Sequence, residues 1–214
     1  LRIDVDQDPS RSHPIRRQPR NPGTLPAGWP DSFSANYFIP NDNPWVDPTG
    51  NTLEEFWAIG LRSPHTMSYD TVSGQVWIGD VGQGSREEVS LLAKGANFQW
   101  PYREGSIDGP KAKPASLIGI DQPPVWDYDR NSGGCVIGGV VYRGSKHATE
   151  LAGKYLFGDH NSRNLWALTY NEGQQPMVEF LAQVPDSGEA HQLAAFGVDK
   201  DGEVFMCKPA NSNG

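Results

Sequence analysis

Short apolar runs separated by polar turns recur through most of the chain after residue 54. The runs are rich in Val, Ile, Trp, Tyr and Phe, and they end at turns such as "DTVSGQ" and "DKDGE". Branched and aromatic residues favour strands, whereas Gly, Asp and Ser favour the turns between strands. The pattern therefore predicts strands over residues 56–61, 66–69, 75–79, 88–92, 136–142, 154–158, 164–170, 178–184, 193–198 and 203–207.

Helical periodicity is weak by comparison. A 3.6-residue period does not extend past two turns, and only "HATELAG" is typical of a short helix. Residues 1–55 are irregular, because Pro, Asn, Asp and Gly recur in "RNPGTLPAGWPDSF" and "IPNDNPWVDPTGN". We therefore expect a loop-rich segment over 1–55, strands over 56–207 and a short end over 208–214.

The strand pattern contains a repeat. "SYDTVSGQVWIGD", "RGSKHATELAGKYLFGD" and "GVDKDGEVFMC" each place a polar turn ending in Gly before an apolar strand. Gly153 follows Gly74 by 79 residues, and Gly202 follows Gly153 by 49. A period near 40 to 50 residues with insertions, built from about four short strands, is typical of a β-propeller blade. We expect an all-β fragment of a propeller, about two and a half blades long, with Trp77, Phe157, Trp166 and Phe205 mostly buried.

Composition narrows the functional classes. The chain has 214 residues, a formal charge of −8 and a pI near 5.0, which argues against nucleic acid because phosphates need a basic surface. Small neutral substrates or cations remain compatible with this charge. No apolar run reaches the length of about 18 residues that a membrane span needs. Cys135 and Cys207 are either a disulfide or two small buried apolar residues.

The segment "GDVGQGSREEV" is the first candidate for chemistry. It places Asp80, Glu87 and Glu88 within nine residues, and Gly82 and Gly84 let the backbone turn tightly. Ca²⁺ takes six to eight oxygen ligands, several of them backbone carbonyls that a glycine turn exposes. The simpler alternative is that Asp80 caps the turn while Glu87 and Glu88 begin a solvated strand.

Four longer stretches together resemble a known family: "WAIGLRSPHTMSYD", "GQVWIGDVGQGSREEVSLLAKGANFQWPYREG", "GCVIGGVVYRG" and "LAGKYLFGDHNSRNLWAL". They are similar to the soluble glucose/sorbosone dehydrogenases, which include PQQ-dependent aldose sugar dehydrogenases and share their propeller with the Hedgehog-interacting protein. The resemblance covers residues 54–207, and weakly "LRIDVD" at the start. It implies a six-bladed propeller of which this chain is the C-terminal half, with both ends continuing in a longer parent protein.

The resemblance also implies a calcium site. It assigns Glu88 and the backbone oxygen of Phe98 as calcium ligands. In PQQ-binding members, backbone carbonyls at the positions of Gly82 and Gln83 hold the calcium that binds the cofactor. Asp80 would lie behind these ligands.

Two arginines are the expected quinone contacts. Arg62 in "GLRSPH" corresponds to an arginine that binds the quinone oxygens or carboxylates, and its planar fork suits that task. The alternative is a structural arginine paired with an acidic neighbour. Arg163 in "NSRNLW" matches an arginine that we expect to face the channel, with His160 as its neighbour and His65 at another strand end. The catalytic histidine of the family would lie upstream of Leu1, so we expect no catalytic residue in this chain.

Several positions depart from the family pattern. Ser63 replaces an Asn, Ile137 a Thr and Asn161 a Lys, and only His191 is polar over residues 190–193, where the family has arginines. Two functions therefore stay open. The first is part of an exported, extracellular or periplasmic quinoprotein that uses Ca²⁺ and PQQ to oxidise an aldose or polyol and passes electrons to an acceptor protein. The second is a non-catalytic propeller that binds a carbohydrate or protein partner.

Overall fold

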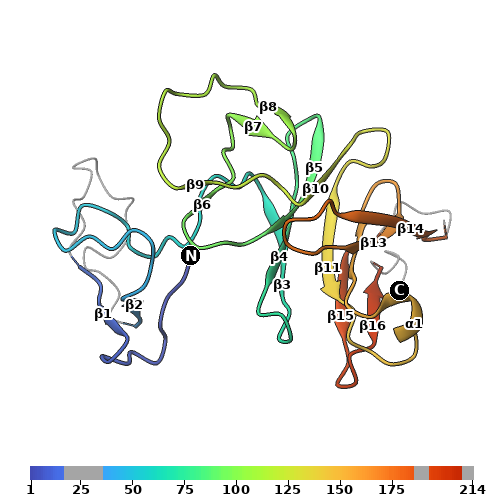
Figure 1. The fold of residues 1–214 in the computed structure, drawn as a ribbon, viewed down its shortest axis with the longest axis horizontal. Helices are drawn as coiled ribbons and strands as arrows, with labels where there is room; N and C mark the ends of the chain where they lie inside the picture. The colour runs from blue at the N-terminus through green and yellow to red at the C-terminus, as the bar shows by residue number, and fades with distance from the viewer. Residues whose placement is uncertain (17–35, 186–192, 209–214) are drawn as a thin grey trace, which may run out of the picture. The chain divides into compact units, whose positions relative to one another are not determined.

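The computed structural model describes residues 1–16, 36–185 and 193–208. The chain divides into two compact units, and the larger one comprises Gly60–Leu92, Phe98–Leu117 and Gln122–Gly214. Strands predominate in the described residues, and their one helix, α1 (Ala148–Leu151), lies within the predicted "HATELAG" segment (Figure 1). None of the described residues belongs to a helix long and apolar enough to cross a membrane.

The smaller unit comprises Leu1–Ile59, Ala93–Asn97 and Ile118–Asp121. Its strands are short: β1 (Ser12–Pro14) pairs antiparallel with β2 (Phe38–Pro40), and β6 (Ala96–Asn97) pairs parallel with β9 (Ile120–Asp121). Residues 41–58 contain no strand or helix, as the Pro and Asn content of this stretch predicts.

A buried carboxylate organises these loops. Glu54 is 1% exposed and accepts hydrogen bonds from Arg16 Nη1 at 2.7 Å and from the Asp47 amide at 2.6 Å. The strand predicted over 56–61 was wrong, because Ile59 makes only an isolated bridge with Asn97. The apolar residues of that run pack within loop structure instead of extending a sheet.

The larger unit contains two antiparallel four-stranded sheets (Figure 1). The first has the order β10-β5-β4-β3, and its strands are β3 (Pro64–Tyr69), β4 (Val76–Asp80), β5 (Arg86–Leu91) and β10 (Trp126–Asp129). A small hairpin of β7 (Arg103–Glu104) and β8 (Ile107–Asp108) lies in the connection from β5 to β10. The sequence pattern missed β10, because "WDYD" is too short and acidic to stand out as a strand.

The second sheet is a simple meander in the order β11-β12-β13-β14, followed by a separate hairpin. Its strands are β11 (Val136–Val141), β12 (Tyr155–Asp159), β13 (Asn164–Thr169) and β14 (Met177–Gln183), and the hairpin consists of β15 (Ala195–Val198) and β16 (Val204–Cys207). These bounds confirm the predicted strands to within two residues.

Aromatic residues fill the space between the two sheets. Trp77 of the first sheet stacks on Tyr155 of the second, with ring centroids 4.4 Å apart, and Phe157 stacks on Trp166. Each such ring removes a large apolar area from water, which is the main favourable term in folding. β11 also packs against β3 on one side and β15 on the other, so the first strands of three successive sheets are neighbours. This arrangement is that of propeller blades.

The burial predictions hold for three residues out of four. Trp77, Phe157 and Trp166 are buried, but Phe205 is 58% exposed. Phe205 lies on β16, which pairs only with β15 in the described residues, so no further strand covers its side chain. The two cysteines are both free, so the disulfide alternative is wrong. Cys135 is partly buried and Cys207 is exposed, so the alternative of two buried apolar residues is wrong for Cys207 as well.

Candidate functional site

Each four-stranded sheet has an aspartate at the end of its second strand. Asp80 ends β4, and its carboxylate accepts the backbone N–H groups of Arg62 at 2.9 Å and Ser63 at 2.6 Å. Asp159 ends β12 and accepts the N–H groups of Gly134 and Cys135 at 2.8 Å. In both sheets the aspartate therefore caps the loop that leads into the first strand, which explains the repeated Gly-Asp pair. The simpler alternative expected Asp80 to cap the glycine turn that follows it, but its carboxylate caps the loop that precedes β3 instead.

The turn after Asp80 wraps around a second carboxylate. Glu104 Oε1 accepts the backbone N–H groups of Gly84, Ser85 and Arg86 at 2.8 to 3.2 Å. Burial acts to raise the pKa of Glu104, but these N–H groups outweigh it and hold the pKa below its usual value. Gly82 is required here, because an added Cβ would lie 1.5 Å from the Arg86 carbonyl oxygen.

Arg62 lies on the carbonyl side of this turn. Its Nη1 donates to the Val81 carbonyl at 2.9 Å, and its Nε and Nη2 donate to the Gln83 side-chain oxygen at 3.0 and 2.6 Å. The guanidinium also lies 5.6 Å from the centre of the Trp100 ring. The structure thus brings Arg62 together with Gln83 and the neighbouring Gly82, as the sequence analysis expected. The alternative, an ion pair between the Arg62 guanidinium and an acidic side chain, does not occur among the described residues. The Arg62 backbone N–H donates to Asp80, and the charge of Arg62 acts to lower the pKa of that carboxyl against the larger effect of burial.

The expected calcium ligands are the Glu88 carboxylate and the Phe98 carbonyl. Glu88 is 7% exposed, and its Oε1 accepts the Gly105 N–H at 2.7 Å. Burial, with the nearby carboxylates of Asp80 and Asp127, raises the pKa of Glu88 to about 7. The carbonyl of Phe98 accepts a long contact of 3.4 Å from Arg103 Nη2. No cluster of three or more His, Cys, Asp or Glu side chains suited to a metal occurs in the part of the chain that the structure describes.

Glu87 and Glu88 do not form the solvated strand start that was the alternative. Glu87 is fully buried, and its carboxylate pairs with Arg130 and accepts the Val136 N–H at 2.8 Å. Burial raises the pKa of both Glu87 and Glu88, because it disfavours their charged forms. The assignment of Glu88 and the Phe98 carbonyl as calcium ligands stays a prediction.

The second sheet carries the remaining candidates. Arg163 has a backbone φ of 63° in the turn between β12 and β13, and its N–H donates to the Asp159 carbonyl at 3.0 Å. His160 Nδ1 lies 2.8 Å from the Leu193 carbonyl oxygen, whereas His65 is exposed on β3. A cofactor contact by Arg163 stays a prediction.

The departures from the family pattern have different surroundings. Ser63 accepts the Val81 N–H at its backbone oxygen, so its backbone supports the same turn. Ile137 is 2% exposed and packs with Leu165 and Leu193 in a core cluster. Ile137 is therefore a packing residue in this chain. His191 lies outside the described residues.

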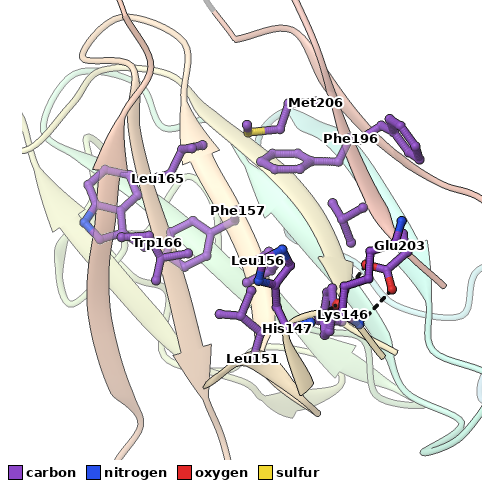
Figure 2. Close-up of a pocket in the computed structure, with 14 residues that line it drawn as sticks. Lys146, His147, Leu151, Leu156, Phe157, Leu165, Trp166, Phe196, Glu203 and Met206 are labelled. Atoms are coloured by element: carbon purple, nitrogen blue, oxygen red, sulfur yellow. Dashed lines mark hydrogen bonds between the residues drawn. The ribbon is translucent and has the colours of Figure 1, made fainter. Parts of the chain in front are cut away.

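An apolar cavity of about 320 Å³ lies between the second sheet and the β15–β16 hairpin (Figure 2). Figure 2 shows Phe196 and Met206 on one side and Leu165 and Trp166 on the other. The carboxylate of Glu203 at its edge already accepts the Tyr142 hydroxyl and two backbone N–H groups. Lys146 and His147 also line the cavity, but most of its lining side chains are apolar, so we take the turn near Arg62 as the better candidate site.

Two residues of this site were not foreseen. Glu104 lies 20 residues from Gly84, and Arg130, which donates from Nε to the Gly84 carbonyl at 3.0 Å, lies 46 residues away. Glu104 lies within the stretch over residues 74–105 that carries the family resemblance, but nothing in that stretch marks it as a partner of the turn. Arg130 lies outside the four resembling stretches.

Comparison with known proteins places the chain among sugar dehydrogenases and their relatives. The family described as glucose/sorbosone dehydrogenase matches residues 33–213. HIPL1 protein of Arabidopsis thaliana is 31% identical over 78% of this chain and 24% of its own length. Aldose sugar dehydrogenase of Escherichia coli is 25% identical over 81% of this chain and 48% of its own length. The human Hedgehog-interacting protein is 24% identical over 85% of this chain and 24% of its own length.

Solved structures share the fold. A glucose dehydrogenase structure has a TM-score of 0.64 at 24% identity, over 82% of this chain and 48% of that one. This chain thus spans about half the length of that glucose dehydrogenase and of the Escherichia coli aldose sugar dehydrogenase, and about a quarter of HIPL1. With a family match that covers most of its residues and two sheets arranged as propeller blades, the chain belongs to the glucose/sorbosone dehydrogenase family.

Proposed function

We propose that this chain is the part of a PQQ-dependent dehydrogenase that holds one side of the cofactor, in a protein that oxidises an aldose sugar or related polyol. The observation that carries the proposal is the charge of Arg62. Its guanidinium contacts the Val81 carbonyl, the Gln83 amide oxygen and the Trp100 ring, all of them electrically neutral. A partly exposed cation without an ion-pair partner in the described residues favours an anionic ligand.

PQQ has the matching chemistry, because it carries carboxylates beside an ortho-quinone. When bound, it accepts the two electrons that leave the sugar. The residues of this chain bind and orient: Arg62 offers charge-assisted hydrogen bonds, and the turn at Gly82 and Gln83 offers backbone carbonyls. The base that accepts the sugar proton is not assigned to a residue of this chain.

Calcium is the second part of the proposal. A buried Glu88 with a pKa near 7 is destabilised when charged, and a divalent cation would offset that penalty. Backbone carbonyls would complete the ligand set, since Ca²⁺ takes oxygen ligands of several kinds. The acidic neighbours Asp80 and Asp127 favour a cation at the same place.

Replacement of Arg62 tests the cofactor assignment. Isothermal titration of PQQ into the protein, with Ca²⁺ present, should show binding by the wild type. Arg62→Ala should weaken that binding by about ten- to a hundredfold, because losing a charge-assisted hydrogen bond costs about 1.5 to 3 kcal/mol. Arg62→Lys keeps the charge but loses the planar fork, so it should fall between the two.

Lys94→Ala is a matched control, because Lys94 is also a cation over an indole ring, that of Trp57, and its loss changes the net charge equally. It should leave PQQ affinity unchanged. Equal affinities for wild type and Arg62→Ala would contradict the assignment.

A non-catalytic propeller is the second candidate, favoured by the likeness to the human Hedgehog-interacting protein, whose name states a protein partner. It predicts no PQQ uptake at any concentration and no effect of Arg62→Ala except on stability. The dehydrogenase proposal includes export to the periplasm or cell exterior and an electron-acceptor protein. Sugar-dependent dye reduction by the protein loaded with PQQ and Ca²⁺ separates the two candidates.

A further inference from the structure

Arg130 lies at the other end of the turn that Arg62 contacts. Arg130 follows β10, and its side chain is 33% exposed. Its Nε donates to the Gly84 carbonyl at 3.0 Å, while its Nη1 pairs with the fully buried carboxylate of Glu87. In a similar way, Arg62 donates from Nη1 to the Val81 carbonyl. The two arginines therefore bind the carbonyls that flank Gly82 and Gln83.

The charges of the two arginines are balanced differently. Arg62 has neutral partners, whereas Arg130 is paired with Glu87. The second oxygen of Glu87 accepts the Val136 N–H at 2.8 Å, at the beginning of β11. Arg130 is thus connected through Glu87 to the second sheet, and the Glu87 carboxylate balances its charge. This arrangement fits a residue that holds the turn in place, with Arg62 left to meet a ligand.

Glu104 also holds this turn in place. Glu104 accepts the N–H groups of Gly84, Ser85 and Arg86, so the peptide groups there have one allowed orientation. A planar guanidinium can satisfy the Gly84 carbonyl and the Glu87 carboxylate together, because its donors point in fixed directions. A lysine ammonium would keep the charge but could not reproduce both directions.

We propose that Arg130 is a positioning residue of the candidate site. It orients the carbonyls of Gly82 and Gln83 by holding the Gly84 end of the turn against Glu87. The proposal rests on the proposed function in one respect, namely that this turn contacts the cofactor or its cation. The orientation of the turn itself does not depend on a ligand.

Arg130→Lys is the central variant, and Arg143→Lys is its matched control. Arg143 donates from Nε and Nη2 to the buried Asp70, at the opposite end of β3 and β4 from Arg62. Both substitutions exchange an arginine at a buried carboxylate for a lysine, so both should weaken the fold to a similar degree. Amide hydrogen exchange without ligand and titration of PQQ with Ca²⁺ are then measured on each protein.

We expect Arg130→Lys to speed exchange of the Gly84, Ser85 and Arg86 amides by about tenfold, the equivalent of one net hydrogen bond. We expect PQQ affinity to fall by about tenfold as well, while Arg143→Lys changes neither. If Arg130→Lys is poorly folded, the double variant Arg130→Gln/Glu87→Gln removes the charged pair without leaving a buried charge, and the same changes are expected.

Exchange at the turn that matches the Arg143→Lys control would overturn the positioning role. If the wild type takes up no PQQ, the proposed function fails, but the exchange measurement still decides whether Arg130 orders the turn. If exchange rises while PQQ affinity stays unchanged, the turn does not contact the cofactor and the positioning role in the site is refuted.

Discussion

Each four-stranded sheet has a turn directly after its second strand. In both sheets an aspartate precedes this turn, but different residues hold the two turns in place. Asp80 and Asp159 each bind the backbone of the loop entering their sheet. Asp159 also holds its own turn, because it accepts the N–H groups of Asn161 and Ser162 at 2.8 Å. The turn after Asp80 is held from outside, by Glu104, Arg62 and Arg130. The aspartate of the Gly-Asp pair thus binds the entering loop in both sheets. Only the first sheet adds the glycine turn, and the candidate site lies at that turn.

The difference extends into the next strand. Gly79 pairs with Val89 and Gly158 pairs with Leu165, so Glu88 in the first sheet corresponds to Asn164 in the second. Asn164 donates to the Ser132 carbonyl at 2.9 Å and carries no charge. At this strand position a buried carboxylate therefore occurs in the first sheet and an uncharged amide in the second. A turn that depends on distant residues can be shaped for a ligand, while a self-contained turn mainly stabilises its sheet.

The largest loss of stability should come from removing the Asp159 carboxylate, which caps the loop entering the second sheet. Asp159 is fully buried and also accepts the Tyr128 hydroxyl at 2.7 Å, so Asp159→Ala leaves several buried donors without partners. We expect unfolding free energy to fall by about 3 to 5 kcal/mol, measured by urea denaturation. Asp80→Ala removes the acceptor of two N–H groups and should cost about 1 to 3 kcal/mol. Equal losses would show that the two caps do not differ.

The glycine turn offers a sharper internal comparison. Gly82→Ala places a methyl group 1.5 Å from the Arg86 carbonyl oxygen, and the turn must open to relieve the clash. We expect a loss of about 1 to 3 kcal/mol in unfolding free energy, together with weaker PQQ binding. Gly84→Ala is the control, because an added Cβ there meets nothing within 4 Å, and it should change stability by less than about 0.5 kcal/mol. Similar results for the two variants would mean that the turn is not tightly held.

The smallest expected effect is a pH dependence confined to Glu88. Its folded pKa of about 7 lies above its ordinary value of 4.5, so the folded protein keeps a proton that the unfolded chain releases. Stability from this group is complete below about pH 4.5 and is lost as pH rises to about 7. We expect wild type to lose about 1 to 2 kcal/mol more than Glu88→Gln between these pH values, in urea denaturation with a chelator present.

Asn164→Ala serves as the comparison from the second sheet and should leave that pH difference unchanged. Added Ca²⁺ should flatten the wild-type profile if Glu88 binds the ion, because the bound cation favours the carboxylate. A wild-type profile parallel to that of Glu88→Gln would remove Glu88 as a site of raised pKa.

Local sequence patterns predicted most strands of the larger unit and three of the four core aromatics, but they missed β10 and gave a wrong strand over 56–61. Alternating apolar residues and glycine turns predicted the second sheet to within two residues, because these signals are local. The burial of Trp77 and Phe157 followed from the same pattern. Phe205 was wrong because burial also depends on what lies beside β16, which a strand pattern does not contain.

Only the tertiary structure decided how the candidate site is assembled. The resemblance pointed to Arg62, Gly82 and Gln83, but only the folded structure shows that the hydrogen-bond partners of the Arg62 guanidinium are neutral, among them Gln83, 21 residues away. Glu104 reaches the turn from β7, and Arg130 reaches it from the loop after β10. Hydrophobic periodicity encodes which residues form a strand. It does not encode which distant charged side chain meets a given carbonyl, because that choice depends on the packing of the loops.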